Sequence, residues 1–235
     1  MLKVKFTSQF KKDYKIAIKR GFDKEKMRTV IELLCLQKEL PVKYMDHSLV
    51  NSRNYKNMRE LHTERLLLRT PRERDAAEIM AIHNSAFVMK NNVMEVFDKE
   101  QMVHLIHREI DYENTWYIER KEDGALLGMI AAEEDGVRFD VRSRCLSYYL
   151  GEQYTRQGYM KEALRAVLHE LFTEEDLEVV AARVFTGNIA SEKLLRSLGF
   201  VYEGCIRRCV RTSESEIRDD MQFSLLREEY FEAEK

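Results

Sequence analysis

The order of hydrophobic patterns after residue 63 most restricts how this 235-residue chain can fold. Strict alternation of apolar residues predicts strands, and a spacing of three to four residues predicts helices. The patterns follow the order β-α-α-β-β-β-α-β-α-β-β. Strands are expected at about 63–69, 115–120, 125–132, 144–150, 179–185, 200–210 and 216–226, and helices from about 71 and at 98–110, 158–172 and 188–198. This order predicts an α+β fold with a mixed, mostly antiparallel sheet.

The turn around Gly158 has the features of a diphosphate-binding site. A diphosphate needs several converging backbone N–H donors and the positive end of a helix. A strand that ends in a turn and leads directly into a helix supplies both. Gly158 has no Cβ, so the turn can approach a ligand closely, and Arg156 and Lys161 add positive charge. The alternative is an ordinary strand-turn-helix connection.

A second helix is expected to begin at Asn188. Asparagine is a favoured N-cap residue, and capping alone would account for it. The helix ends at Gly199, and Phe200 is expected to pack in the core of the next strand. Ser191 places a small hydroxyl side chain in the first turn of this helix.

Together the two segments resemble the acetyl-CoA-binding half of the RimJ/RimL branch of the GNAT N-acetyltransferases. The first segment contains Tyr148-Tyr149-Leu150-Gly151 and Tyr154-Thr155-Arg156-Gln157-Gly158-Tyr159-Met160-Lys161-Glu162-Ala163-Leu164. The second runs Asn188-Ile189-Ala190-Ser191-Glu192-Lys193-Leu194-Leu195-Arg196-Ser197-Leu198-Gly199-Phe200. The order of the elements is also that of the GNAT acyl-CoA N-acyltransferase fold, so the resemblance implies a GNAT domain at residues 63–235 with a small amino-terminal α/β extension.

The resemblance also implies which residues hold acetyl-CoA, as a co-substrate and without a metal. The first segment would grip the pyrophosphate, and the second would lie along the pantetheine arm. The implied contacts come from Tyr149, Leu150, Arg156, Gln157, Gly158, Tyr159, Met160, Asn188 and Ser191. Relatives usually have a second glycine two residues before Gly158, where this chain has Arg156.

GNAT enzymes transfer the acetyl group directly from the thioester to an amine in a ternary complex. The resemblance implies that backbone near Tyr149 binds the oxyanion. Many GNATs protonate the leaving thiolate with a tyrosine of the final helix, but that position is Leu195 here. RimJ/RimL relatives are thought to use a serine, which makes Ser191 the expected acid. Alternatively, Ser191 is small only to leave space for the thiol.

The general base is left open. Relatives often carry a glutamate where this chain has Cys145, and a thiol with a reference pKa of about 8.5 is a poor substitute. Glu133, Glu134 and Glu152 are near in sequence and could act through water. Bulk solvent could also deprotonate the amine. Because Cys145 and Leu195 depart from the pattern, a catalytically degenerate acetyl-CoA-binding or interaction protein is the alternative function.

The acceptor side is expected in the segment from Phe87 to His107. This segment departs most from relatives and carries aromatic residues, methionines and histidines that can line a pocket: Phe87, Met89, Met94, Phe97, His104 and His107. The acceptor would be a primary amine, either a protein N-terminus or a small molecule.

Residues 1–62 resemble the front half of RelE/YafQ-type toxin ribonucleases. The resemblance rests on Phe6-Thr7-Ser8-Gln9-Phe10-Lys11-Lys12-Asp13, Leu40-Pro41, Tyr44-Met45-Asp46-His47-Ser48-Leu49 and Tyr55-Lys56-Asn57-Met58-Arg59-Glu60-Leu61-His62. His47 and His62 fall on positions that these toxins use, but the later strands of the toxin fold are missing. The expectation is a truncated segment that does not cut RNA, while a toxin-antitoxin-related module with ribonuclease ancestry is the alternative.

Charge is divided unevenly along the chain. Residues 1–60 carry a net charge of +8, and the remainder carries −10, although the whole chain has only −2. The basic segment could attract nucleic acid or dock on an acidic surface. Helices are expected at residues 8–20 and 24–38, and both have apolar faces. These faces favour docking and a homodimer through residues 1–62, with nucleic acid unlikely.

The composition points to a cytoplasmic protein without a membrane anchor. Charged residues make up 34% of the chain, and no apolar run reaches the roughly 20 residues of a membrane helix. The four cysteines (Cys35, Cys145, Cys205 and Cys209) lack the spacing of a metal site, so packing thiols in a reducing compartment are expected.

Overall fold

The computed structural model describes residues 59–93, 95–212 and 216–233. The chain divides into two compact units, residues 1–53 and 54–235, and the description below concerns the second unit. The expectations for the first 58 residues, including the role of His47, lie outside the described residues.

The second unit contains the expected strands and helices in the expected order. Its strands are β1 (Leu61–His62), β2 (Leu66–Arg69), β3 (Thr115–Arg120), β4 (Leu126–Glu134), β5 (Ser143–Leu150), β6 (Val179–Phe185), β7 (Val201–Arg211) and β8 (Ile217–Leu226). Its α-helices are α3 (Ala76–His83), α4 (Ala86–Met89), α5 (Lys99–Tyr112), α6 (Tyr159–Thr173), α7 (Ile189–Ser197) and α8 (Arg227–Ala233), and two short 3₁₀ helices cover Glu73–Asp75 and Glu152–Tyr154.

The strands form one sheet in the order β1-β2-β3-β4-β5-β6-β8-β7. The pair β5–β6 is parallel, and every other pair is antiparallel. The expected α+β fold with a mixed, mostly antiparallel sheet is therefore confirmed.

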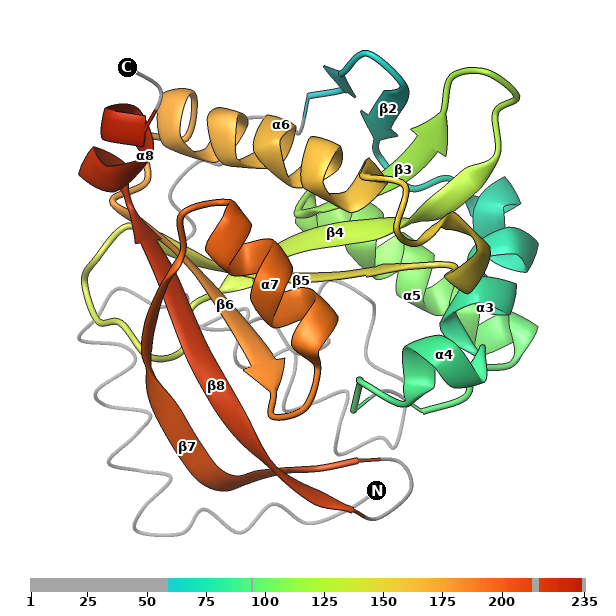
Figure 1. The fold of residues 1–235 in the computed structure, drawn as a ribbon. Helices are drawn as coiled ribbons and strands as arrows, with labels where there is room; N and C mark the ends of the chain where they lie inside the picture. Colours follow the sequence, from blue (N-terminus) through green and yellow to red (C-terminus); the bar gives the residue numbers. More distant parts are fainter. Residues whose placement is uncertain (1–58, 94, 213–215, 234–235) are drawn as a thin grey trace, which may run out of the picture. The chain divides into compact units, whose positions relative to one another are not determined.

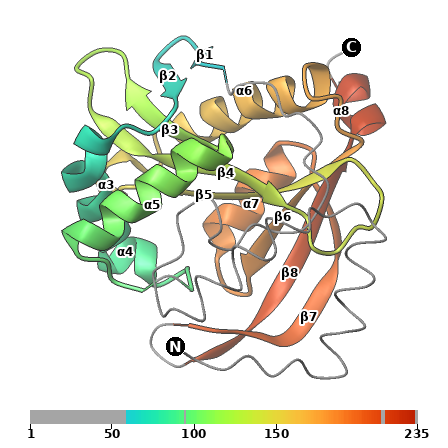
Figure 2. The same cartoon turned by 180° about the vertical axis from the view of Figure 1, so that it is seen from behind.

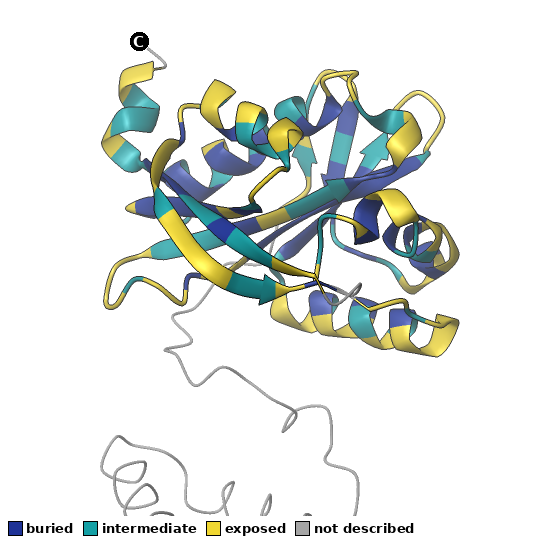
Figure 3. Ribbon diagram, turned by 60° about the horizontal axis from the view of Figure 1, so that its bottom comes forward, coloured by how far each residue is buried: buried dark blue, intermediate teal, exposed yellow. Residues whose placement is uncertain are grey.

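Helices cover both faces of this sheet (Figures 1 and 2). Helices α6 and α7 lie on one face, and α3 and α5 lie on the other. The larger core cluster joins α6 to the sheet through residues such as Leu146, Leu164 and Val180. A smaller cluster joins α3 and α5 to β3 and β4 through Ile79, Ile106 and Tyr117. Figure 3 shows the central strands as the buried layer, whereas β7 is largely exposed.

Alternating residues of β5 therefore serve different faces. Leu146, Tyr148 and Leu150 pack with the core beneath α6, whereas Tyr149 packs with the cluster beneath α3 and α5. This alternation follows from the two-residue repeat of a strand.

Four short elements were not expected from the sequence, namely β1, α4, α8 and the 3₁₀ helix Glu152–Tyr154. Strand β1 pairs Leu61 and His62 with β2, so the sheet begins slightly before residue 63. In the part of the chain that the structure describes, every helix is too short or too polar to cross a membrane.

Candidate active site at the separation of two strands

Strands β5 and β6 pair over only part of their length. Their register runs from Ser143 opposite Val179 to Leu146 opposite Ala182. Strand β5 continues to Leu150 and stays paired there with Gly128 of β4 on its other side. The last four residues of β5 are therefore not paired with β6, and their main-chain groups on that side have no strand partner. Such groups can bind a ligand placed between the strands.

Helices α6 and α7 both begin near the carboxyl ends of β5 and β6, where the two strands are no longer paired. Because β5 and β6 are parallel, their carboxyl ends lie at the same edge of the sheet, and each strand leads into one of these helices. Both helices lie on the same face (Figure 1). Their first turns have N–H groups without intrahelical partners and carry partial positive charge. The fold thus brings together the two segments that were expected to share one ligand.

The turn before α6 contains two residues in the left-handed region. Gly158, the N-cap of α6, has φ +83°, and Arg156 has φ +59°. An arginine therefore holds the conformation that glycine adopts most easily, at a cost of about 1 kcal/mol. A Cβ at Gly158 would lie 3.4 Å from Arg65 Nη2, which is ordinary contact, so the positive φ is what makes another residue costly here.

Arg65 holds this turn in place, which the sequence did not indicate. Its Nη1 donates to the carbonyl of Gln157 at 3.0 Å, and its Nε donates to Glu162 Oε2 at 2.7 Å. Its guanidinium lies 4.4 Å from the ring centre of Tyr159. Thr63 Oγ1 adds a 2.5 Å hydrogen bond to the same glutamate. The loop that precedes α6 is thus fixed by a side chain from the other end of the domain.

Several expected cofactor residues place their side chains in the core. Leu150, Tyr159 and Met160 are each less than 10% exposed. Gln157 turns its side-chain amide to the carbonyl of Gln153 at 2.9 Å. Any contact that Leu150, Tyr159 and Met160 make with a diphosphate would therefore come from the backbone, whereas the side chain of Gln157 is exposed.

The first turn of α7 arranges Asn188 and Ser191 as expected for a cap. The Asn188 side chain accepts a hydrogen bond from Ser191 N at 3.3 Å. The Ser191 hydroxyl lies 2.6 Å from the hydroxyl of Tyr148, which reaches it from β5. Leu195, at the position of the usual tyrosine, is fully buried in the core and offers no donor.

On the opposite face, a row of residues leads from β5 to a buried carboxyl group. Tyr149 lies opposite Met129, which lies opposite Tyr117. Tyr117 donates a 2.8 Å hydrogen bond to Glu109 Oε2 of α5. Burial raises the pKa of Glu109 to about 7.

A second carboxyl group lies within electrostatic reach of Glu109. Glu133 of β4 is exposed, yet desolvation by neighbouring atoms raises its pKa, while a hydrogen bond from Ser147 opposes this shift. The negative charge of Glu133 contributes to the raised pKa of Glu109. Glu109 can therefore exchange a proton near neutral pH, and the pKa of Glu133 lies above the ordinary glutamate value. Glu109 was missed from the sequence because only its burial against Tyr117 distinguishes it from a surface acid.

The other candidates for a base are less suitable. Burial raises the pKa of Cys145 to about 12, so this thiol remains protonated near neutral pH. Glu134 adjoins Glu133 and therefore projects to the other face of β4. Glu152 is exposed in the 3₁₀ helix after β5.

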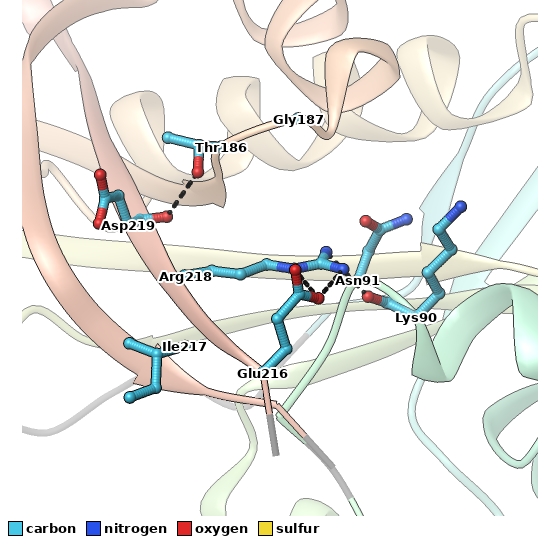
Figure 4. Close-up of a pocket in the computed structure, with 8 residues that line it drawn as sticks. All are labelled: Lys90, Asn91, Thr186, Gly187, Glu216, Ile217, Arg218 and Asp219. Atoms are coloured by element: carbon cyan, nitrogen blue, oxygen red, sulfur yellow. Dashed lines mark hydrogen bonds and ion pairs between the residues drawn. The ribbon is translucent and has the colours of Figure 1, made fainter. Parts of the chain in front are cut away.

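An open pocket of about 400 Å³ adjoins the start of α7 (Figure 4). It is lined by residues from three places: Lys90 and Asn91 after α4, Thr186 and Gly187 before α7, and Glu216, Ile217, Arg218 and Asp219 in or next to β8. Arg218 joins two of these places, because it donates to the Lys90 carbonyl at 3.2 Å and to Glu216 at 2.6 Å. The pocket is polar and open to solvent.

The segment from Phe87 to His107 is divided among different environments. Lys90 and Asn91 line the pocket, and Phe97 stacks on His83 at 4.8 Å. His104 and His107 are exposed on the side of α5 opposite to Met102, Ile106 and Glu109, and His107 contacts Glu73 at 3.2 Å. The two histidines therefore face away from the sheet.

Comparison with known families gives two matches. The sequence model described as an acetyltransferase (GNAT) domain matches residues 65–201, more than half of the chain. The model of the YafQ toxin of bacterial type II toxin–antitoxin systems matches residues 2–84 and overlaps the first match. The second match covers about a third of the chain and agrees with the toxin-like pattern of the first residues.

Curated relatives are N-acetyltransferases of Bacillus. The uncharacterized N-acetyltransferase YoaA of Bacillus subtilis is 29% identical over 154 residues, which cover 63% of this chain and 86% of YoaA. The uncharacterized N-acetyltransferase p20 of Bacillus licheniformis is 28% identical over 183 residues, which cover 74% of this chain and 99% of p20.

Solved structures share the fold. A GNAT-family acetyltransferase from Bacillus anthracis has a TM-score of 0.66 at 22% identity, covering 72% of this chain and 99% of that chain. The ribosomal-protein-S5-alanine acetyltransferase of Vibrio fischeri has 0.63 at 19%, covering 73% and 98%. The spermidine N-acetyltransferase of Vibrio cholerae, in complex with CoA and spermine, has 0.64 at 19%, covering 72% and 99%.

These matches agree with the separated strands, the helix starts beside them and the order of the elements. The GNAT fold is confirmed, and α6 and α7 lie at about the expected positions in the sequence. The chain therefore belongs to the GNAT acetyltransferase family and is an acetyl-CoA-dependent N-acetyltransferase.

Proposed function

We propose that residues 63–235 form an N-acetyltransferase of the RimJ/RimL type, which passes the acetyl group directly to a primary amine in a ternary complex. The observation that carries this proposal is the separation of β5 from β6. At this place the first turns of α6 and α7 lie on one face of the sheet, and the carboxyl groups of Glu109 and Glu133 lie on the other. A thioester held between the strands could be reached by an amine from the carboxylate side.

Acetyl-CoA would be held mainly by main-chain groups. The turn from Arg156 to Gly158 and the first amides of α6, at Tyr159 and Met160, would bind the diphosphate. Asn188, Ser191 and the free edge of β5 would line the pantetheine arm. The left-handed backbone at Gly158 and the pinning of the loop by Arg65 support this assignment.

Glu133 would accept the proton of the attacking amine. It is exposed, so an amine can reach it, and its raised pKa makes it a stronger base than an ordinary glutamate. The negative charge of Glu133 contributes to the raised pKa of Glu109, so ionisation of one carboxyl group would disfavour ionisation of the other. The main-chain N–H of Leu150, on the free edge of β5, would stabilise the oxyanion, because strand alternation turns the N–H of Tyr149 toward β4.

Ser191 would protonate the leaving thiolate. It stands in the first turn of α7, and Leu195 cannot serve in its place because an aliphatic side chain has no proton to donate. A Ser191→Ala variant is expected to lose about tenfold in kcat, or ~1.4 kcal/mol, with little change in KM. An unchanged kcat would make Ser191 a small residue that only leaves space.

The acceptor would enter by the pocket beside Lys90 and Thr186. Two structural neighbours suggest the range of acceptors, since one is a ribosomal-protein-S5-alanine acetyltransferase and the other a spermidine N-acetyltransferase. A protein N-terminus and a small polyamine are therefore both to be tested.

The experiment has two stages. Calorimetry with acetyl-CoA should show binding at micromolar to millimolar cofactor, and Gly158→Glu should abolish it by placing a charged side chain in the turn. A transfer assay over peptide N-termini, polyamines and amino-sugar antibiotics should then find an amine that accelerates the turnover of acetyl-CoA. If acetyl-CoA binds but no amine accelerates its turnover, the result would instead favour a catalytically degenerate acetyl-CoA-binding protein.

Residues 1–62 are proposed to form a truncated toxin-like segment of a cytoplasmic homodimer, without ribonuclease activity. The YafQ match supports the toxin-like ancestry. Sedimentation of the full chain should give twice the mass of one chain. Cleavage of ribosome-bound messenger that is lost on changing His47 or His62 would contradict the proposal.

A further inference from the structure

The hydroxyl groups of Tyr148 and Ser191 form a pair that joins β5 to α7. They are 2.6 Å apart and come from residues 43 positions apart in sequence. Tyr148 lies two residues beyond Leu146, the last residue of β5 that pairs with β6. Its side chain therefore crosses from the separated end of β5 to the first turn of α7.

The direction of this hydrogen bond decides which proton remains available. A single hydrogen bond between two hydroxyl groups uses the proton of one and leaves the proton of the other free. A phenol is the stronger acid of the two and thus the better donor. Burial raises the pKa of Tyr148 to about 12, so the phenol keeps its proton at neutral pH. Tyr148 then donates to Ser191 Oγ, and the serine proton is left for a second acceptor.

We infer that Tyr148 is a positioning residue for proton donation, because its hydroxyl orients the Ser191 proton toward the sulfur of the departing thiol. This inference rests on the proposed function, in which Ser191 is the acid. Tyr148 would thus supply, from β5, a phenol that many relatives supply from the helix that corresponds to α7, where this chain has Leu195.

The transfer step balances with this arrangement. The bond between the amine nitrogen and the acetyl carbon forms, the bond between that carbon and sulfur breaks, and its electron pair stays on sulfur. Ser191 gives its proton to sulfur while the Tyr148 hydrogen bond stabilises the oxygen that loses it. Glu133 takes one proton from the amine and releases it to solvent, and solvent returns one to Ser191.

Tyr148→Phe is the direct test, since it removes one oxygen and keeps the ring that packs on the core. The expected result is a loss of about tenfold in kcat with KM changed by less than about twofold. Tyr202→Phe is the matched control, because it removes a phenol hydroxyl from the half-exposed Tyr202 of β7 and should leave kcat unchanged.

A second measurement needs neither an acceptor nor turnover. The pKa of the CoA thiol is read from thiolate absorbance against pH, with the thiol bound to each variant. A hydrogen bond from Ser191 favours the thiolate and lowers this pKa in the parent protein. Tyr148→Phe should raise it toward the value with Ser191→Ala, whereas Tyr202→Phe should not change it.

The double variant separates positioning from an independent role. If Tyr148 acts only through Ser191, adding Tyr148→Phe to Ser191→Ala should cause no further loss in kcat. A loss equal to the product of the two single losses would overturn the inference, as would parent-like kcat and thiol pKa in Tyr148→Phe. A parent protein that does not bind CoA would refute the proposed function itself, and the inference with it.

Discussion

The hydroxyl of Tyr117 donates a 2.8 Å hydrogen bond to Glu109 Oε2 and so joins β3 to α5 beneath the sheet. Glu109 is 8% exposed, and its pKa is raised to about 7 chiefly by burial. The pKa of this carboxyl group is higher in the folded protein than in the unfolded chain, so ionisation costs more in the folded protein. The group therefore stabilises the fold fully only at a pH where it is protonated in both states. Its contribution is therefore complete below about pH 4.5 and is lost as the pH rises through 7.

Glu109→Gln should remove this pH dependence. The amide oxygen can still accept from Tyr117, but nothing ionises. The parent protein should lose about 3 kcal/mol of unfolding free energy between pH 4.5 and 8, and the variant much less. Urea unfolding at several pH values measures this, with Glu78→Gln on the exposed side of α3 as the control. Equal slopes in parent and Glu109→Gln would show that Glu109 ionises normally.

Glu133→Gln tests the base. A base must be ionised to accept a proton, so kcat/KM should fall as the pH drops through its pKa, which is raised above the ordinary glutamate value. The variant should lose about a hundredfold in kcat/KM at neutral pH together with this limb of the pH profile. Glu134→Gln, one residue along the same strand, is the control. If kcat/KM of Glu133→Gln depends on pH as in the parent protein, Glu133 is not the base and solvent deprotonates the amine.

Two substitutions at Arg156 separate strain from charge. Arg156→Gly relieves the left-handed backbone and should raise stability by about 1 kcal/mol. Arg156→Ala keeps the strain and should not. Both remove one positive charge from the diphosphate loop, so both should weaken acetyl-CoA binding more at low salt than at high salt. Thermal unfolding and calorimetry at two salt concentrations distinguish the effects, and equal stability in both variants would contradict the strain.

Arg65→Ala should loosen the loop before α6. It removes the hydrogen bond to the Gln157 carbonyl and the ion pair to Glu162. We expect acetyl-CoA to bind about three- to tenfold more weakly, because the loop must then be ordered on binding. Arg165→Ala removes an exposed arginine from α6 and serves as the control. An unchanged dissociation constant in Arg65→Ala would show that the loop is ordered without this arginine.

Hydrophobic periodicity predicted most of the fold because long elements repeat their pattern several times. The strand at 115–120 and the strand at 179–185 have the expected bounds, and α6 differs from its expected range by one residue at each end. Strand β1 and helix α4 escaped prediction because two and four residues are too few to show a period. Their presence depends on the neighbours that they contact.

The candidate site was predictable only where it depends on local sequence. The turn at Gly158 and the cap at Asn188 are local motifs, and the structure has both. The partners of Ser191, Gln157 and Tyr117 could not be read from the chain, because Tyr148, Arg65 and Glu109 reach them from other elements. Burial of Glu109 in particular exists only after α5 packs on β3.

The short pairing of β5 with β6 divides the sheet into two leaves that share only four opposed residue pairs. Amide exchange should reveal this division. The amides of β4 should exchange slowly along their length, whereas those of β5 beyond Leu146 that point toward β6 should exchange faster. Acetyl-CoA seated between the leaves would then connect them and slow that exchange, so that the ligand would complete the sheet.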